Sequence, residues 1–218
     1  MREISNQLVL KGTTTIGLVC NDGIILSSDT RVTMGTFIAH KKGKKIYKID
    51  DHIAMTISGS VADAQRLVDI LVANARLYKI SFGRPIPIKS ASRLLSNLLF
   101  SSRYYPLIAQ VIVGGIDNSG THIFSLDPLG SLVEEKCVAT GSGSPVAYGV
   151  LEDKYREGTP TSEMLPVAVH ALQAAMKRNS ASGDSFDIAV IGKDGYRELT
   201  DEEKANIAET KSELRRKE

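Results

Sequence analysis

The run Gly12-Thr13-Thr14-Thr15 is the first segment of the sequence with residues suited to nucleophilic chemistry. Consecutive threonines are also typical of the start of a β-strand, so the residue types alone leave two interpretations open. The chemical interpretation needs Gly12, because glycine reaches backbone conformations closed to other residues and could expose its carbonyl to the Thr13 hydroxyl. If the peptide bond between them breaks, the new α-amine of Thr13, with an ordinary pKa of about 8, can serve as the base for its own hydroxyl.

A carboxylate and a lysine follow at positions that the folded chain can bring close to Thr13. Asn21-Asp22-Gly23 is a turn signal, and the hairpin that it predicts returns Asp29 beside the threonines. Lys44-Lys45 leads directly into the next apolar run, and a lysine at a strand start can point inward. A buried ammonium near Thr13 would lower the pKa of the hydroxyl and of the α-amine, with Asp29 as counter-ion. The plainer interpretation is that both groups are solvated.

The run Ser58-Gly59-Ser60 lies where a predicted strand passes into a predicted helix. Helix N-termini present backbone N–H groups and the positive end of the helix dipole, so the Gly59 N–H could stabilise an oxyanion. The alternative is a plain strand-to-helix turn with Ser60 as the N-cap, and both interpretations can hold together.

Two later loops carry hydroxyl groups. Residues 140–145 (TGSGSP) form a glycine-rich loop before a helix, but no Gly-Lys-Ser/Thr follows, so the loop is not a phosphate-binding Walker motif. We interpret it as a tight turn that places hydroxyls near a site. Residues 179–184 (NSASGD) follow a helix, with Gly183 expected near the helix C-cap. Ser182 in this loop could contact the Thr13 amine.

Hydrophobic periodicity predicts the elements that hold these residues. The order is strands, two helices, strands, two helices and strands, which differs from the strict alternation of a parallel sheet. We therefore expect an α+β protein with two stacked antiparallel sheets between helix layers. The predicted strands are 13–20, 24–28, 46–49, 53–58, 107–113, 121–126, 186–191 and 195–199, and the predicted helices are 61–78, 88–99, 144–156 and 161–178.

The composition excludes several classes of protein. The chain has 218 residues, of which 42% are hydrophobic, and its net charge of +2 is too small to indicate a nucleic-acid or membrane partner. No apolar run approaches the roughly 18 residues of a membrane span, and the N-terminal segment is too short and polar for a secretory signal. Cys20 and Cys137 suit a reducing compartment, and the four scattered histidines have no metal-ligand spacing. We expect a cytoplasmic protein without a metal or cofactor.

Taken in order, these motifs resemble the β-type subunits of archaeal-type 20S proteasomes, within the N-terminal nucleophile hydrolases. The resemblance runs from Gly12 to about Tyr196 and implies a four-layer αββα sandwich. It implies a propeptide at 1–12 removed by self-cleavage, a peptidase domain at 13–200 and a charged tail at 201–218. The motifs that carry it are GTTT, SDTRVT, KKIYKID, MTISGS, LLSNLL, VGGID, TGSGSP, YGVLE and SASG.

The resemblance also implies a mechanism and a set of site residues. Thr13 would be the nucleophile of an acyl transfer, with its freed amine as proton acceptor and Gly12-Thr13 as the cleavage site. Lys45 would be the catalytic cation, Asp29 its orienting carboxylate and Gly59 the oxyanion donor. The hydrogen-bond network around the amine would comprise Ser142, Ser182 and Asn179. The mostly apolar substrate pocket would comprise Val32, Gly43, Tyr47, Ile57 and Val61.

The implied partners are proteasome α-type subunits, further copies of the chain in seven-membered β rings, a regulatory ATPase ring and unfolded polypeptide substrates. One alternative is a structural β subunit that cuts poorly, because Asn179 stands where the family usually has an aspartate. A bacterial two-ring relative is a weaker alternative, since it usually begins directly at Thr after Met. Nucleic-acid binding through the lysines of residues 41–48 would need a basic surface that the net charge does not promise.

Overall fold

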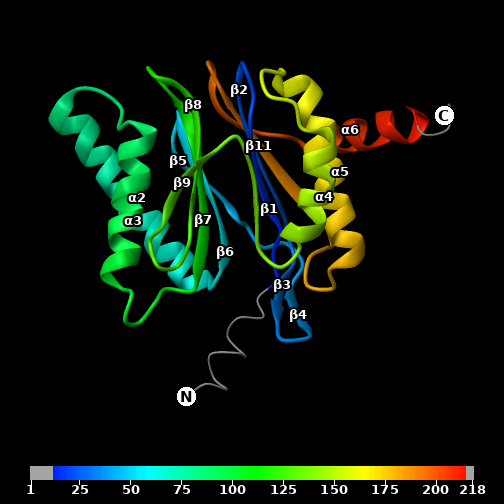
Figure 1. The fold of residues 1–218 in the computed structure, drawn as a ribbon, viewed down its shortest axis with the longest axis horizontal. Helices are drawn as coiled ribbons and strands as arrows, with labels where there is room; N and C mark the ends of the chain where they lie inside the picture. The colour runs from blue at the N-terminus through cyan, green and yellow to red at the C-terminus, as the bar shows by residue number, and fades with distance from the viewer. Residues whose placement is uncertain (1–11, 215–218) are drawn as a thin grey trace.

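The two five-stranded antiparallel sheets of the protein stack face to face, and helices cover both outer faces (Figure 1). The computed structural model describes residues 12–214, with side chains up to residue 208. Apart from Gly12, the expected propeptide lies outside the described residues. The layers run from α2 and α3 through the two sheets to α4 and α5. The expected αββα sandwich is confirmed.

The first sheet holds the N-terminal threonines and the strand that ends at Asp29. Two of its central strands, Thr15–Val19 and Gly23–Asp29, are buried at every residue, including the polar Ser27, Ser28 and Asp29. Thr15 pairs with Ser28 on one side and with Thr140 on the other. The strand order is β10 (Cys137–Thr140), β1 (Thr15–Val19), β2 (Gly23–Asp29), β11 (Phe186–Gly192) and β12 (Gly195–Glu198).

The second sheet is a meander in which each strand pairs with the next along the chain. Its strands are β5 (Ile46–Asp50), β6 (Ile53–Gly59), β7 (Ala109–Asp117), β8 (Gly120–Leu126) and β9 (Leu132–Glu135). A separate hairpin of β3 (Val32–Met34) and β4 (Phe37–His40) follows the first sheet's β2.

The helices bury their apolar stripes against the outer faces of the sheets. α2 (Val61–Phe82) and α3 (Ile88–Ser101) cover the second sheet, while α4 (Ser144–Lys154) and α5 (Thr161–Arg178) cover the first. The charged C-terminal stretch, expected to be an exposed helix or frayed tail, forms α6 (Asp201–Leu214). Ile207 and Ala208 of α6 pack against the core beneath α5, so this helix is anchored at one face.

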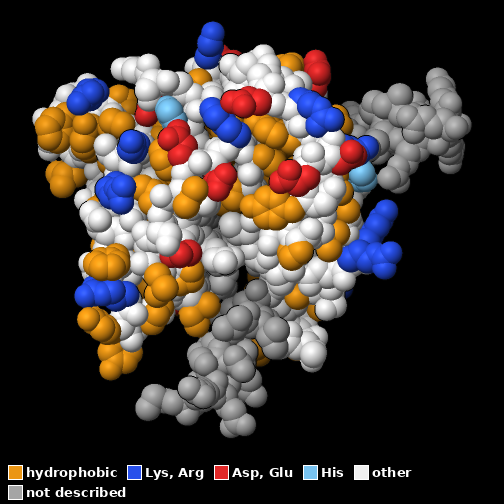
Figure 2. Space-filling view, in the orientation of Figure 1, with side chains coloured by type: hydrophobic (Ala, Val, Ile, Leu, Met, Phe, Trp, Pro, Cys, Tyr) orange, Lys and Arg blue, Asp and Glu red, His pale blue; other side chains and the backbone are white. Residues whose placement is uncertain are grey.

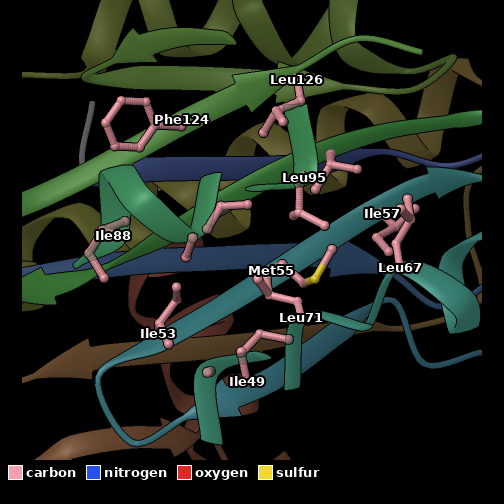
Figure 3. Packing of buried hydrophobic residues seen from close by; sticks show 14 of the residues in the cluster. Ile49, Ile53, Met55, Ile57, Leu67, Leu71, Ile88, Leu95, Phe124 and Leu126 are labelled. Carbon is pink, nitrogen blue, oxygen red and sulfur yellow. The ribbon is translucent and has the colours of Figure 1, made fainter. Parts of the chain in front are cut away.

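Three apolar clusters fill the spaces between the four layers. Alternate residues of β2 serve two of them, since Ile25 points to α4 and α5 while Ile24 and Leu26 point to the second sheet. Figure 3 shows the cluster under α2 and α3, where Met55 of β6 lies beside Leu71 of α2. The labelled members are Ile49, Ile53, Met55, Ile57, Leu67, Leu71, Ile88, Leu95, Phe124 and Leu126.

The predicted strands and helices are all present, with ends that shift by up to four residues. The strand predicted from residue 13 begins at Thr15, which leaves Thr13 and Thr14 outside the ladder. Four strands were missed: β3, β4, β9 and β10. Each has only three or four residues, too few for an alternating pattern to stand out in the sequence.

Candidate active site

The predicted nucleophile, Thr13, lies immediately before β1 and is almost fully buried. Its hydroxyl donates a hydrogen bond to the carbonyl oxygen of Gly12 at 2.7 Å. Gly12 itself donates from its backbone N–H to the Thr33 hydroxyl at 3.0 Å. The hydroxyl of Thr13 therefore lies against the carbonyl of the one peptide bond at which cleavage was predicted.

A glycine is also required at position 12 because the backbone there lies very close to the loop after α5. A Cβ atom added to Gly12 would lie 1.8 Å from the Cβ of Ala181 and 2.3 Å from its carbonyl oxygen. No real side-chain atom approaches another so closely. The sequence suggested a conformational reason for glycine at this position, and the structure adds this steric one.

The Asp29 carboxylate, at the end of β2, is completely buried and accepts four hydrogen bonds. Its Oδ1 accepts from the Thr14 N–H and from the Lys45 ammonium, both at 2.8 Å. Its Oδ2 accepts from the Gly183 N–H at 3.1 Å and from the Arg31 N–H at 3.2 Å. One carboxylate thus ties the segment after Thr13 to the loop after α5 and to the lysine.

Lys45 is the inward-pointing lysine that the sequence predicted, directly before β5. Only 7% of its side chain is exposed. Burial lowers the pKa of Lys45, and this effect outweighs the opposing attraction of the Asp29 carboxylate. Lys45 and Thr13 line the same small pocket, so an ammonium that gives up its proton more readily than usual lies beside the predicted nucleophile.

Gly59 ends β6 and lines the same pocket as Thr13. Its φ of +134° lies in a region that side chains disfavour, and an added Cβ would lie 2.1 Å from the Ile108 carbonyl oxygen. The position therefore accepts glycine alone. Ser60 occupies the N-cap of α2, as the alternative interpretation had it, but its side chain makes no capping hydrogen bond.

Ser142, Ser182 and Asn179 form one hydrogen-bonded chain beside the threonines. The Asn179 side-chain NH₂ donates to the Ser142 hydroxyl at 2.6 Å and to the Ser182 hydroxyl at 3.1 Å. Ser142 accepts from the Thr13 N–H at 3.4 Å. Ser182, expected near the Thr13 nitrogen, instead bonds to the Thr14 hydroxyl at 2.8 Å.

The helix that ends before this loop has Asn179 rather than a glycine as its C-cap. Gly183 was expected in the C-cap region, but it does not cap the helix. Gly183 lies further along the loop, where its N–H serves Asp29 and its missing side chain leaves room for the Arg31 guanidinium.

Comparison with known proteins places this geometry in a family. The model of the proteasome subunit family matches residues 9–191. The chain belongs to the proteasome family. It is 52% identical to the "Proteasome subunit beta" of Methanohalophilus mahii, over 94% of this chain and 99% of the relative. It is 51% identical to the protein of that name from Methanocaldococcus jannaschii, over 93% and 91%. The relative from Ferroglobus placidus is 50% identical over 92% and 96%.

Membership of the proteasome family confirms the resemblance to β-type subunits and the N-terminal nucleophile hydrolase fold. The match covers every residue of the candidate site, from Gly12 to Asp184. None of the helices in the part of the chain that the structure describes is long and apolar enough to cross a membrane.

The predicted substrate pocket of this proteasome-family chain opens beside Thr13. Four of its five predicted residues, Val32, Tyr47, Ile57 and Val61, line that pocket. Gly43 does not line the pocket but packs against Val32, which does, since a Cβ added to Gly43 would lie 2.3 Å from Cγ2 of Val32. The pocket is also lined by Arg31, Thr33, Lys44 and Ala64, which the sequence reasoning did not assign to it.

Arg31 is a structural residue of the site that the sequence reasoning missed. Its guanidinium donates to the Asp184 carboxylate at 2.8 Å and to the Ser180 carbonyl at 2.7 Å. The bond to Arg31 lowers the pKa of Asp184, whose φ of 65° is unusual for a residue with a side chain. Arg31 thus ties the loop that carries Ser182 and Gly183 to the end of β2.

The lysines of residues 41–48 do not form a uniform basic strip. Lys45 is buried against Asp29, while Lys44 pairs with Glu198 and Lys48 pairs with Asp51. On the face shown in Figure 2, basic and acidic side chains are intermixed. Within the described residues, no cluster of three or more His, Cys, Asp or Glu side chains has a metal-binding arrangement.

Proposed function

We propose that this chain is a catalytic β-type subunit of a 20S proteasome core particle and acts as a threonine endopeptidase on unfolded polypeptides. The observation that carries the proposal is the 2.7 Å hydrogen bond from the Thr13 hydroxyl to the Gly12 carbonyl, beside the buried Lys45–Asp29 pair. A hydroxyl held at a carbonyl, with a cation nearby and a base to be released, is what acyl transfer to threonine needs.

Self-cleavage is the first step of the proposal. The Thr13 oxygen attacks the carbonyl carbon of Gly12, the C–N bond breaks, and the hydroxyl proton ends on the released Thr13 nitrogen. Residues 1–12 are then held as an ester on Thr13, and water hydrolyses that ester. The fit of Gly12 against Ala181 and its bond to Thr33 support this step, because they fix the carbonyl in place.

Substrate hydrolysis repeats the same chemistry with the amine now free. The Thr13 amine takes the hydroxyl proton as the oxygen attacks a substrate carbonyl, and it gives a proton to the leaving amine. The Gly59 N–H stabilises the oxyanion, and the Lys45 ammonium stabilises the developing charge. Water then hydrolyses the acyl ester and regenerates Thr13. Asp29 positions Lys45 rather than reacting itself.

The subunit would work inside an assembly. The names of the relatives support proteasome α-type subunits and further β subunits as its partners. Seven-membered β rings of this chain, fed by a regulatory ATPase ring in the cytoplasm, complete the proposal. Residues 13–200 would form the peptidase domain and α6 would belong to a charged tail.

The pocket predicts a cleavage preference. Val32, Tyr47, Ile57 and Val61 present mostly apolar surface next to Thr13. Cleavage should therefore favour a large apolar residue on the N-terminal side of the bond. A panel of fluorogenic peptides tests this, and a preference for acidic or basic residues at that position would contradict it.

The intact mass of the chain after co-expression with its α-type partner tests the main proposal. We expect a loss that matches residues 1–12 in assembled particles, together with peptidase activity. The Thr13→Ala variant is the matched control and should keep its full mass. A full-length parent chain in correctly assembled particles would overturn the proposed self-cleavage.

A structural β subunit with weak peptidase activity is the second candidate. One observation favours it: Asn179, which bonds to both serines beside Thr13, carries no charge, whereas the resemblance described above implies an aspartate at this position. Particles that assemble, lose residues 1–12 and still hydrolyse no peptide of the panel would support this candidate over the first.

A further inference from the structure

The orientation of the Asn179 amide is fixed by a backbone group. Its oxygen accepts a hydrogen bond from the Ala181 N–H at 3.1 Å. A flipped amide would turn its NH₂ group toward this N–H, so that two donors would face each other. The NH₂ group must therefore face the two serines, and Asn179 acts as a donor to Ser142 and Ser182.

This direction removes Asn179 as an acceptor for the Ser142 proton, which leaves the Thr13 nitrogen and, because Ser142 is exposed, solvent. The Ser142 oxygen accepts from Asn179 at 2.6 Å, so its own O–H cannot point back to that residue. The Thr13 nitrogen lies at 3.4 Å from the same oxygen. In the uncleaved chain this nitrogen is an amide and can only donate, but after cleavage it is an amine with a lone pair that can accept.

We propose that Asn179 makes Ser142 a hydrogen-bond donor to the freed amine of Thr13 and thereby keeps this amine in its neutral, proton-accepting form. The inference rests on the proposed function and adds to it how the base of the site is tuned. A hydrogen bond to the neutral form of a group favours that form. Asn179 acts through Ser142 and is a positioning residue.

An aspartate at position 179 would have the opposite effect. A carboxylate can only accept, so the Ser142 proton would turn to it, and the Ser142 oxygen would then accept from the amine. Such a bond favours the ammonium form of the Thr13 amine, and the negative charge nearby favours it further. This one substitution would thus add a negative charge and reverse the donor–acceptor direction of the hydrogen bonds from residue 179 through Ser142 to the Thr13 nitrogen.

Four charged groups around the site are paired with one another. Asp29 of β2 pairs with Lys45, and Arg31 pairs with Asp184. On the side of α4 and α5, the contacts to the Thr13 nitrogen run through Ser142 and Asn179, which are neutral. The charged groups near this region include Asp29, Lys45, Arg31 and Asp184, together with Asp187 of β11, which acts on Lys45, Lys41, which acts on Asp184, and Lys44, which lines the pocket of Thr13.

The test compares pH profiles of kcat/KM for a fluorogenic peptide in assembled particles that have lost residues 1–12. The acid limb of the profile reports the protonation of the free enzyme's base. For Asn179→Asp we expect this limb to move to higher pH by about one unit or more. Arg178→Gln is the charge-matched control, because it makes the same change in net charge at the neighbouring exposed residue.

Arg178→Gln should move the acid limb by less than about 0.3 unit, since a charge on the surface is screened. Ser142→Ala removes the donor without adding charge and should move the limb upward by a smaller amount than Asn179→Asp. It also tests the inference should Asn179→Asp fail to assemble.

An acid limb that stays in place or moves downward in Asn179→Asp or Ser142→Ala would overturn the inference. Equal shifts in Asn179→Asp and Arg178→Gln would overturn it too, because they would assign the effect to net charge. A parent particle that keeps residues 1–12 and hydrolyses no peptide would instead overturn the proposed function, so the two failures are distinct.

Discussion

The Lys45 ammonium lies 2.8 Å from the Asp29 carboxylate, and the exposed fractions of the two side chains are 7% and 0%. Because water hardly reaches either group, each depends on the other for compensation of its charge. Three backbone N–H groups complete the shell of Asp29. The pair is therefore both a candidate catalytic device and a structural joint between two sheets.

Removing one partner of this pair should be costly. Lys45→Met leaves the buried Asp29 carboxylate without a cation, and loss of one partner of a buried ion pair costs about 3–5 kcal/mol. The free energy of unfolding of Lys45→Met, measured by urea denaturation, should therefore fall by about this amount. The variant should also have no peptidase activity. The double variant Asp29→Asn/Lys45→Met should lose less stability than the sum of the two single losses, because no uncompensated charge stays buried, and it should be inactive. Additive losses in the double variant would contradict this coupling.

Gly12→Ala should slow the release of residues 1–12. The new methyl group would overlap Ala181, so Gly12 cannot lie where the Thr13 hydroxyl meets its carbonyl. We expect cleavage to be slower by at least about tenfold, because a misplacement of about 1 Å can cost up to about a hundredfold in rate. Intact mass over time measures it.

Gly149→Ala is the matched control for this substitution, because a Cβ there meets nothing within 4 Å. Its particles should lose residues 1–12 at the parent rate. Equal cleavage rates in Gly12→Ala and the parent would mean that the contact with Ala181 is irrelevant to the reaction.

Arg31→Lys should reduce kcat/KM clearly and change the melting temperature only slightly. Lysine keeps the charge but loses the fork that binds Asp184 and the Ser180 carbonyl together, so the loop with Ser182 is held less firmly. We expect kcat/KM to fall about tenfold, with a small change in melting temperature because partly exposed pairs contribute little. Arg197→Lys alters the surface pair with Glu203 and should leave both quantities unchanged.

The cysteines should be unreactive in the folded chain. Burial raises the pKa of Cys20 and of Cys137 to about 12, from an ordinary value of about 9. The thiolate fraction at neutral pH is then lower by about a thousandfold, since each pKa unit is a factor of ten. A thiol reagent at pH 8 should label both residues rapidly in guanidinium and very slowly without it. Fast labelling of the folded chain would show that burial is incomplete.

The raised pKa values of the same two thiols predict how the stability of the fold depends on pH. Between about pH 9 and 12 the unfolded chain loses thiol protons that the folded chain keeps, so stability should fall as the pH rises through this range. Cys137→Ser should reduce this fall relative to the parent.

The sequence predicted the parts of the site that depend on local patterns. The turn at residues 21–23 sets the hairpin that carries Asp29 back to Thr13, and the lysine run before an apolar strand predicted an inward Lys45. The order of strands and helices likewise predicted the sandwich. These signals lie within short windows, so composition and spacing reveal them.

The parts that could not be predicted depend on contacts between distant segments. Arg31 and Asp184 lie 153 positions apart and meet only because β11 pairs with β2, in a register that sets Phe186 opposite Asp29. A charged residue at a strand end is most often solvated, so neither side chain stood out. The direction of the Asn179 amide also depends on the Ala181 N–H, which only the folded loop supplies.

The contact of Gly12 with Ala181 has a consequence for the order of events in the life of the chain. The surroundings of the bond after Gly12 include groups from the far end of the sequence, such as Ser182, which lies 168 positions from its partner Thr14. A chain still under synthesis lacks these groups. If Thr13 is freed by self-cleavage, its amine is released only after the chain has folded, so the proposed peptidase activity begins only in the folded protein.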